Sequence, residues 1–127
     1  MYPVMICGRA GIGPHGPVNM AFDATRATLE FADLDADQCP DGVLATGAAS
    51  LAATTSMEVG VWEHPAGRST DVEADEVFVV LSGRGTVHLA DGTKLDLRPG
   101  TVGVLEAGAE TTWVVAETLR KVWVIPR

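Results

Sequence analysis

The pattern of hydrophobic and polar positions becomes regular after residue 56 and stays regular to the end of the chain. Short β-prone runs alternate there with turns that contain Gly or Pro, which is typical of successive antiparallel strands. The Asp91-Gly92 pair is the best short hairpin signal in the sequence. We expect strands at 57–63, 69–74, 76–81, 86–89, 93–97, 101–105, 111–115 and 119–125. No helix-period stretch competes over this range, so the pattern predicts an all-β antiparallel barrel or sandwich.

The N-terminal part of the chain is less regular. Residues 1–20 are rich in Gly and Pro and predict an irregular arm, with the barrel domain over residues 21–127. Residues 21–39 have a weak apolar pattern that fits a short strand or a helical turn. Pro40–Gly42 predicts a turn, and the small residues at 43–55 fit an edge strand or a loop.

Composition excludes several classes of partner. The chain has 127 residues, of which 9 are basic and 17 acidic, and its net charge is −8. Such a surface repels nucleic acid and anionic lipid, so neither is an expected partner. No apolar run is long enough to span a membrane, and the start of the chain lacks the pattern of a secretory signal. We therefore expect a cytoplasmic protein in which Cys7 and Cys39 are free thiols.

Two motifs then resemble the cupin superfamily over roughly residues 55–127. Glu76, six residues and Gly83 match the second half of the first cupin motif, and Gly100 with Gly108 match parts of the second. The resemblance implies a cupin-type double-stranded β-helix, which is a jelly-roll barrel. Within the superfamily, the chain more closely resembles the small single-domain cupins related to ureidoglycine aminohydrolase. The segments that carry this resemblance are Gly60-Val61-Trp62, Pro65-Ala66-Gly67, Val80-Leu81-Ser82-Gly83, Thr112-Trp113 and Lys121-Val122-Trp123-Val124-Ile125.

The metal-binding histidines of cupins are missing from the matching positions. With one motif spacing these positions are Thr70 and Val72, and with the other they are Ser69 and Asp71; the histidine of the second motif falls on Thr111. The histidines of the chain, His15, His64 and His88, all lie elsewhere. A transition metal needs three or four converging donors. We therefore expect no metal and no other cofactor, and the metal-dependent activity of the aminohydrolase does not carry over.

Glu76 is the first candidate for chemistry. Strand alternation places it on one face with Thr70, Val72 and Phe78, which the resemblance turns toward the barrel interior. The same alternation turns Asp71, Glu73 and Asp75 toward solvent. A carboxylate buried in an apolar barrel has a raised pKa and suits acid–base work or ligand binding. The alternative is that Glu76 accepts structural hydrogen bonds from the backbone or an arginine.

Aromatic and histidine side chains complete the candidate site. Trp62 and Trp113, the latter in phase with Thr111, would form a ligand wall or simply fill the core. His64, in a turn, would either shuttle protons at the barrel mouth or lie exposed. The orientation of His88 stays open because Gly83 and Gly85 interrupt its strand.

We expect a cupin-like barrel that binds a small organic molecule in its interior without metal. The alternative is a metal-free isomerase, epimerase or hydrolase-type enzyme in which Glu76 works with His64 or His88. A metal enzyme with displaced ligands and a plugged barrel with a structural role are further alternatives, so the sequence leaves catalysis open. An arm or an edge strand laid on a partner's sheet would make the protein a homodimer.

Overall fold

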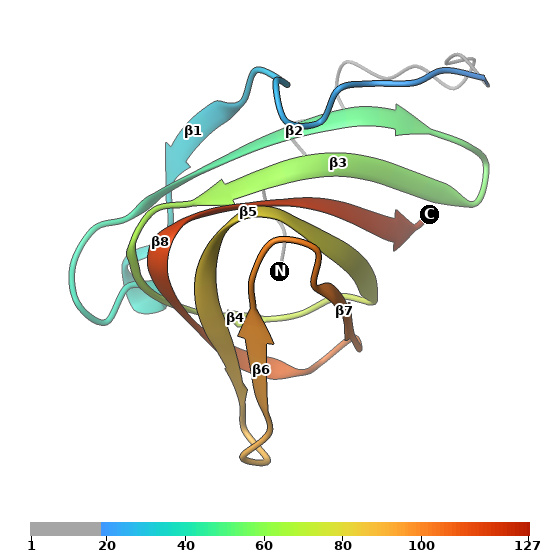
Figure 1. The fold of residues 1–127 in the computed structure, drawn as a ribbon. Helices are drawn as coiled ribbons and strands as arrows, with labels where there is room; N and C mark the ends of the chain where they lie inside the picture. Colours follow the sequence, from blue (N-terminus) through green and yellow to red (C-terminus); the bar gives the residue numbers. More distant parts are fainter. Residues whose placement is uncertain (1–18) are drawn as a thin grey trace.

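The computed structural model describes residues 19–127, so the expected arm at residues 1–20 lies outside the described part except for its last two residues. The regular secondary structure of the described chain is β-strand, apart from one 3-10 turn, and its paired strands are antiparallel (Figure 1). The elements are β1 (Glu30–Asp33), η1 (Ala36–Gln38), β2 (Ala45–Ala53), β3 (Met57–His64), β4 (Gly67–Val72), β5 (Glu76–Leu89), β6 (Lys94–Leu97), β7 (Val102–Leu105) and β8 (Glu110–Pro126).

Two long strands, β5 and β8, form the frame of the barrel. They pair with each other along most of their length. The first half of β5 also pairs with β7 and its second half with β6. Likewise, β8 pairs first with β4 and then with β3, which continues to β2 and β1. The chain therefore curls into two connected layers, and the predicted all-β antiparallel barrel is confirmed (Figure 1).

β5 and β8 were each expected as two strands, and the structure shows each as one. The pairing register shifts around Gly83, where a bulge bends β5 across β8. Gly83 has φ +91°, and a Cβ atom at this position would lie 2.2 Å from the carbonyl oxygen of Thr118. Only glycine fits such a close approach. The glycine that the pattern assigned to a turn instead lets one continuous strand serve both layers.

Further predictions concerned the Asp91-Gly92 turn, the segment 43–55, the strand at 69–74 and the two thiols. Asp91-Gly92 forms the predicted hairpin turn, in which Thr93 N donates to Asp91 Oδ1 at 2.9 Å. The segment 43–55 contains β2, which is a strand; its first half lies between β1 and β3, and its second half pairs with β3 alone among the described strands. The strand expected at 69–74 ends at Val72. Cys39 is a buried free thiol, whereas Cys7 lies outside the described residues.

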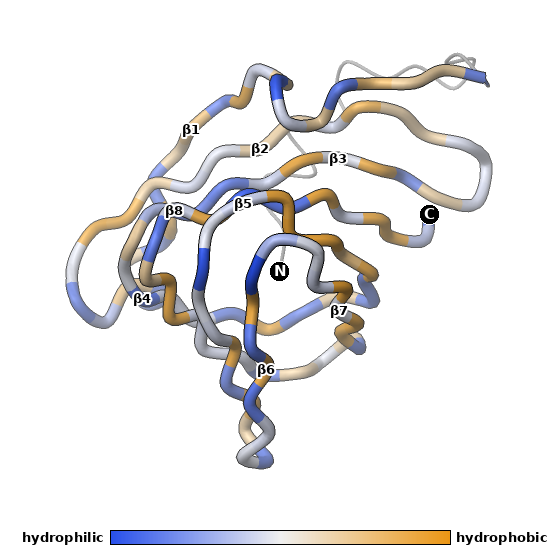
Figure 2. The backbone as a smooth tube through the Cα atoms, in the orientation of Figure 1, coloured by the Kyte–Doolittle hydropathy of each residue, from blue (hydrophilic) through white to orange (hydrophobic). Residues whose placement is uncertain are grey.

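Alternate residues of the strands face the interior, where they form one hydrophobic core. Its largest members are aromatic: Trp62, Phe78, Trp113 and Trp123. The outer surface also carries apolar residues, because Val77, Val102 and Val104 are exposed where β5 and β7 pair. Much of the chain around β7 has the orange colour of hydrophobic residues (Figure 2). Within residues 19–127, no helix is long and apolar enough to cross a membrane.

Candidate functional site in the barrel interior

A buried ion pair links the first residue of β5 to the second half of β8. Lys121 Nζ donates to Glu76 Oε2 at 2.7 Å, and both side chains are completely shielded from solvent. Burial raises the pKa of Glu76, and the neighbouring Lys121 ammonium opposes that rise. The expectation that Glu76 points inward is confirmed, and its partner is a lysine that the sequence analysis did not single out.

Three aromatic rings surround the Lys121 ammonium. Its Nζ atom lies 4.6 Å from the ring centroid of Trp62, 4.7 Å from that of Phe78 and 4.5 Å from that of Trp113. Each distance is within the range of a cation–π interaction. The rings also touch one another, with centroids 5.2 Å apart for Trp62–Trp113 and 5.7 Å for Phe78–Trp113. The interior therefore contains an aromatic box that holds a primary ammonium group.

A second carboxylate, Glu73, lies against the same box. It follows β4 in the connection to β5 and is only 4% exposed. Its Oε2 atom accepts hydrogen bonds from Thr111 Oγ1 at 2.6 Å and from Trp113 Nε1 at 3.0 Å. Trp113 thus contacts Glu73 through its indole N–H and Lys121 through its ring face, which joins both carboxylates into one cluster.

Each of these carboxylates has one oxygen without a hydrogen-bond partner. Glu73 Oε1 and Glu76 Oε1 are buried, and no described residue donates to them. A buried acceptor left unpaired costs about 1–3 kcal/mol, and more when it is charged. Such atoms in a native interior need an explanation. A bound donor group would supply one.

His64, the last residue of β3, lies at the edge of this cluster and is fully buried. The alternative that it is an exposed turn residue is therefore wrong. Its Nδ1 lies 2.6 Å from the carbonyl oxygen of Pro65, which can only accept, so Nδ1 donates, and its Nε2 shares a hydrogen bond of 2.8 Å with Ser69 Oγ. Burial lowers the pKa of His64, and the positive charge of Lys121 adds to that effect. Both ring nitrogens of His64 therefore have hydrogen-bond partners, and its surroundings favour the neutral imidazole.

The expectation that Thr70 and Val72 face the interior is wrong. Both lie on the outer face of β4, where Val72 is 54% exposed. Residues 73–75 leave strand geometry, so the alternation cannot be carried back from β5 into β4. Asp75 is exposed as expected, but Glu73 is buried. Asp71 is partly buried, and burial together with the nearby Glu73 carboxylate raises its pKa.

The remaining predicted site residues lie in the interior. Trp62, Phe78, Thr111 and Trp113 are buried and face the interior. The residues missed were Glu73, Lys121 and Ser69. Lys121 alternates with the buried Leu119 and Trp123, so the pattern itself contained a signal for an inward lysine.

These residues do not fit a transition metal. Because Ser69 faces inward with Asp71, these two correspond to the histidine positions of the first cupin motif, and Thr111 corresponds to that of the second. Neutral hydroxyl groups are weak ligands, and Glu76 is already paired with Lys121. No group of three or more His, Cys, Asp or Glu side chains in residues 19–127 is arranged to hold a metal ion.

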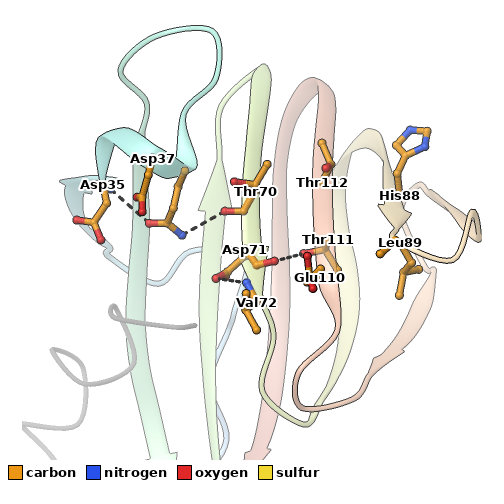
Figure 3. Close-up of a pocket in the computed structure, with 12 residues that line it drawn as sticks. Asp35, Asp37, Thr70, Asp71, Val72, His88, Leu89, Glu110, Thr111 and Thr112 are labelled. Carbon is orange, nitrogen blue, oxygen red and sulfur yellow. Dashed lines mark hydrogen bonds between the residues drawn. The ribbon is translucent and has the colours of Figure 1, made fainter.

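A larger pocket, of about 590 Å³, lies on the outside of the barrel. Asp35 and Asp37 border it on one side, the outer faces of β4 and β8 form its floor, and His88 stands at the opposite edge (Figure 3). Gln38 Nε2 donates to the carbonyl oxygen of Thr70 at 3.2 Å, which fixes η1 against β4. His88 is exposed and faces this pocket rather than the interior.

A smaller pocket, of about 350 Å³, includes Glu76. Its lining combines the inward-facing Leu105 and Ile125 with Val77 and Val104 of the outer face and with rim residues such as Met57. The pocket therefore lies at the rim of the barrel, beside the buried Glu76.

The chain is similar to known proteins of the cupin superfamily. Residues 51–123 match the family model described as the EutQ-like cupin domain. No curated protein matches the chain. EutQ of Clostridium difficile is 18% identical with a TM-score of 0.57; the match covers 64% of this chain and 61% of that one.

Two further solved structures have the same fold. A putative ethanolamine utilization protein Q from Salmonella typhimurium LT2 is 18% identical with a TM-score of 0.58, over 76% of this chain and 94% of that one. A protein of unknown function from Rhizobium leguminosarum bv. viciae 3841 is 24% identical with a TM-score of 0.59, over 65% and 82%. These identities show the fold alone. The family match covers more than half of the chain, which therefore belongs to the cupin superfamily as a EutQ-like cupin domain protein.

Proposed function

We propose that this protein binds a small organic molecule in the barrel interior, without a transition metal. The observation that carries the proposal is the pair of buried acceptors, Glu73 Oε1 and Glu76 Oε1, that no described residue satisfies. They lie next to Trp113 and Lys121, so a ligand there would find acceptors, a cation and aromatic faces together. Ligand sites in proteins commonly combine an apolar wall with a few polar groups.

Stability alone is a weak reason for such an interior. A buried ion pair is often no more stabilising than hydrophobic residues of similar volume, because desolvation offsets the attraction between the charges. The box around Lys121 is otherwise well suited to a plain hydrophobic core, since Phe78 and Trp113 already pack there. The polar cluster is more readily explained as a site than as a structural device.

A thermal-shift screen of the purified protein against a metabolite library tests this proposal. The screen compares the wild-type protein with Glu73→Gln, which removes a buried charge, and with Glu110→Gln, which removes a charge in the outer pocket. We expect at least one metabolite to raise the melting temperature of wild type and Glu110→Gln but not of Glu73→Gln. Metabolites that act equally on all three proteins, or only through Glu110, would contradict an interior site.

An acid–base enzyme is a second candidate, favoured by the pKa of Glu76. Burial raises that pKa toward the neutral range in which a general acid or base works, and it lowers the pKa of His64, which favours the neutral imidazole. It is less well supported, because both ring nitrogens of His64 already have partners. A metabolite found in the screen should then be converted by wild type and not by Glu76→Gln or His64→Gln, as followed by NMR; binding without turnover would exclude this candidate.

The closer relation to ureidoglycine aminohydrolase and the homodimer both stay predictions. For a dimer, the described residues offer one surface, the exposed Val77, Val102 and Val104 on the outer face of β5 and β7. Adjacent exposed apolar residues of this kind often mark contact surfaces. Analytical ultracentrifugation at micromolar concentration should give the mass of a dimer, and Val104→Asp should lower it; a monomeric wild-type protein would contradict the proposal.

A further inference from the structure

The buried charges of the interior are unbalanced. Beside the aromatic box, two carboxylates and one ammonium are almost completely buried: Glu73, Glu76 and Lys121. The interior therefore favours a ligand that brings positive charge.

Lys121 shows what kind of positive charge this interior accommodates. Its ammonium donates to Glu76 Oε2 and faces three aromatic rings at 4.5–4.7 Å. Aromatic faces attract cations, and the attraction is stronger where water is excluded. The interior thus already accommodates one alkylammonium group, the side chain of Lys121 itself.

The free acceptors define the head group further. Glu73 Oε1 and Glu76 Oε1 each lack a donor, and a carboxylate oxygen can only accept. A primary or secondary ammonium would satisfy them by charge-assisted hydrogen bonds, which are stronger than neutral ones. A quaternary ammonium carries the charge but has no N–H to donate. A carboxylate ligand would instead face buried like charges.

We infer that the ligand is a small organic primary or secondary ammonium compound, an inference that rests on the proposed interior site. Its N–H groups donate to Glu73 Oε1 and Glu76 Oε1. Its carbon skeleton lies toward Leu105 and Ile125, two of the apolar side chains that line the 350 Å³ pocket together with Glu76. The Lys121 ammonium favours the ionised form of Glu76 and so opposes the effect of burial on its pKa.

Ligands that share one skeleton and differ in the head group test the inference. The probes are butylamine, 1-butanol, butyrate and butyltrimethylammonium, and the parallel set of benzylamine, benzyl alcohol and benzoate. Binding to the full chain is measured at pH 7 by NMR chemical-shift titration of the Trp indole N–H signals. We expect at least one amine to bind about tenfold more tightly than its alcohol, its carboxylate and the quaternary compound, since about 1.4 kcal/mol corresponds to tenfold in affinity.

Variants assign that binding to the interior. Glu73→Gln should weaken amine binding by about tenfold or more, because an amide N–H then meets the ammonium. Glu110→Gln, in the outer pocket, should leave it unchanged. Equal or tighter binding of an alcohol, a carboxylate or the quaternary compound would overturn the ammonium inference and leave the interior site in place. Amine binding that depends on Glu110 and not on Glu73 would overturn both. If no amine binds, the inference fails, and the metabolite screen decides the proposed function independently.

Discussion

The barrel interior and the outer pocket each gather several carboxylates, but they differ in what surrounds them. The outer pocket is the larger, about 590 Å³ against about 350 Å³ for the pocket beside Glu76. In the outer pocket, Asp35, Asp37 and Glu110 are exposed to water and Asp71 is only partly buried. In the interior, Glu73 and Glu76 are buried, lie against aromatic rings and keep one unsatisfied oxygen each.

The difference shows that pocket size is a poor guide to a site in this molecule. A carboxylate in water is already solvated, so its charge implies little about a ligand. A buried carboxylate needs compensation, and that need is specific in charge, direction and hydrogen-bond type. The predictions below test whether the interior cluster depends on its partners while the outer pocket does not.

The largest effect is expected from Lys121→Met. The substitution leaves Glu76 buried without its cation, so the free energy of unfolding should fall by about 3–5 kcal/mol. Lys94→Met is the matched control, because the Lys94 side chain is 56% exposed and 3.9 Å from Asp96, and we expect it to change stability by less than about 0.5 kcal/mol. Urea unfolding followed by Trp fluorescence measures both. Equal losses in the two variants would contradict a buried ion pair.

A smaller loss of stability is expected from Thr111→Val on β8, and the neighbouring Thr112→Val is its control. Thr111 donates to Glu73 at 2.6 Å from the inner face, whereas Thr112 lies on the outer face. Thr111→Val keeps the shape and removes a hydrogen bond to a buried carboxylate, so it should cost about 1.5–3 kcal/mol. Thr112→Val should stay within about 0.5 kcal/mol of wild type. The same unfolding assay checks this pair, and a neutral Thr111→Val would mean that Glu73 does not depend on that hydrogen bond.

The pH dependence of stability separates the two histidines of the described chain. Burial lowers the pKa of His64 below its ordinary value of 6.5. The stabilisation by neutral His64 is therefore complete above that value and declines as the pH falls toward the lower folded-state pKa, by at most about 1.4 kcal/mol per pH unit. The free energy of unfolding, measured between pH 7.5 and 5, should depend less on pH in His64→Gln than in wild type. The exposed His88→Gln should keep the wild-type slope; the reverse result would contradict the burial of His64.

The smallest effect is expected in the outer pocket. Asp35→Asn removes an exposed carboxylate and should change the free energy of unfolding by less than about 0.5 kcal/mol. It should also leave the thermal shifts from interior ligands unchanged. A loss of ligand response in this variant, at wild-type stability, would move the site from the interior to the outer pocket.

Local signals made most of the fold predictable. The β-prone run at 76–81 and the Asp91-Gly92 turn act within a few residues, and the structure contains both the strand and the hairpin. The bulge at Gly83 could not be predicted from local sequence, because it depends on the close approach of Thr118 from another strand. A glycine looks the same in a sequence whether it forms a turn or admits a neighbouring backbone.

The site was predicted in part, for a similar reason. Alternation within β5 correctly turned Glu76 and Phe78 inward, but it failed across residues 73–75, where the strand is interrupted. This error put Val72 inside and Glu73 outside. The pairing of Lys121 opposite Trp62 depends on the register between β3 and β8, which local pattern does not fix.

The most direct test of an interior ligand site is an electron-density map of the barrel from crystals soaked with butylamine or benzylamine. The account predicts density for an amine head group at hydrogen-bonding distance, about 2.7–3.2 Å, from both Glu73 Oε1 and Glu76 Oε1. A map in which both oxygens accept bonds from the protein's own donors, with the aromatic box closed around Lys121 and no density after soaking, would contradict it.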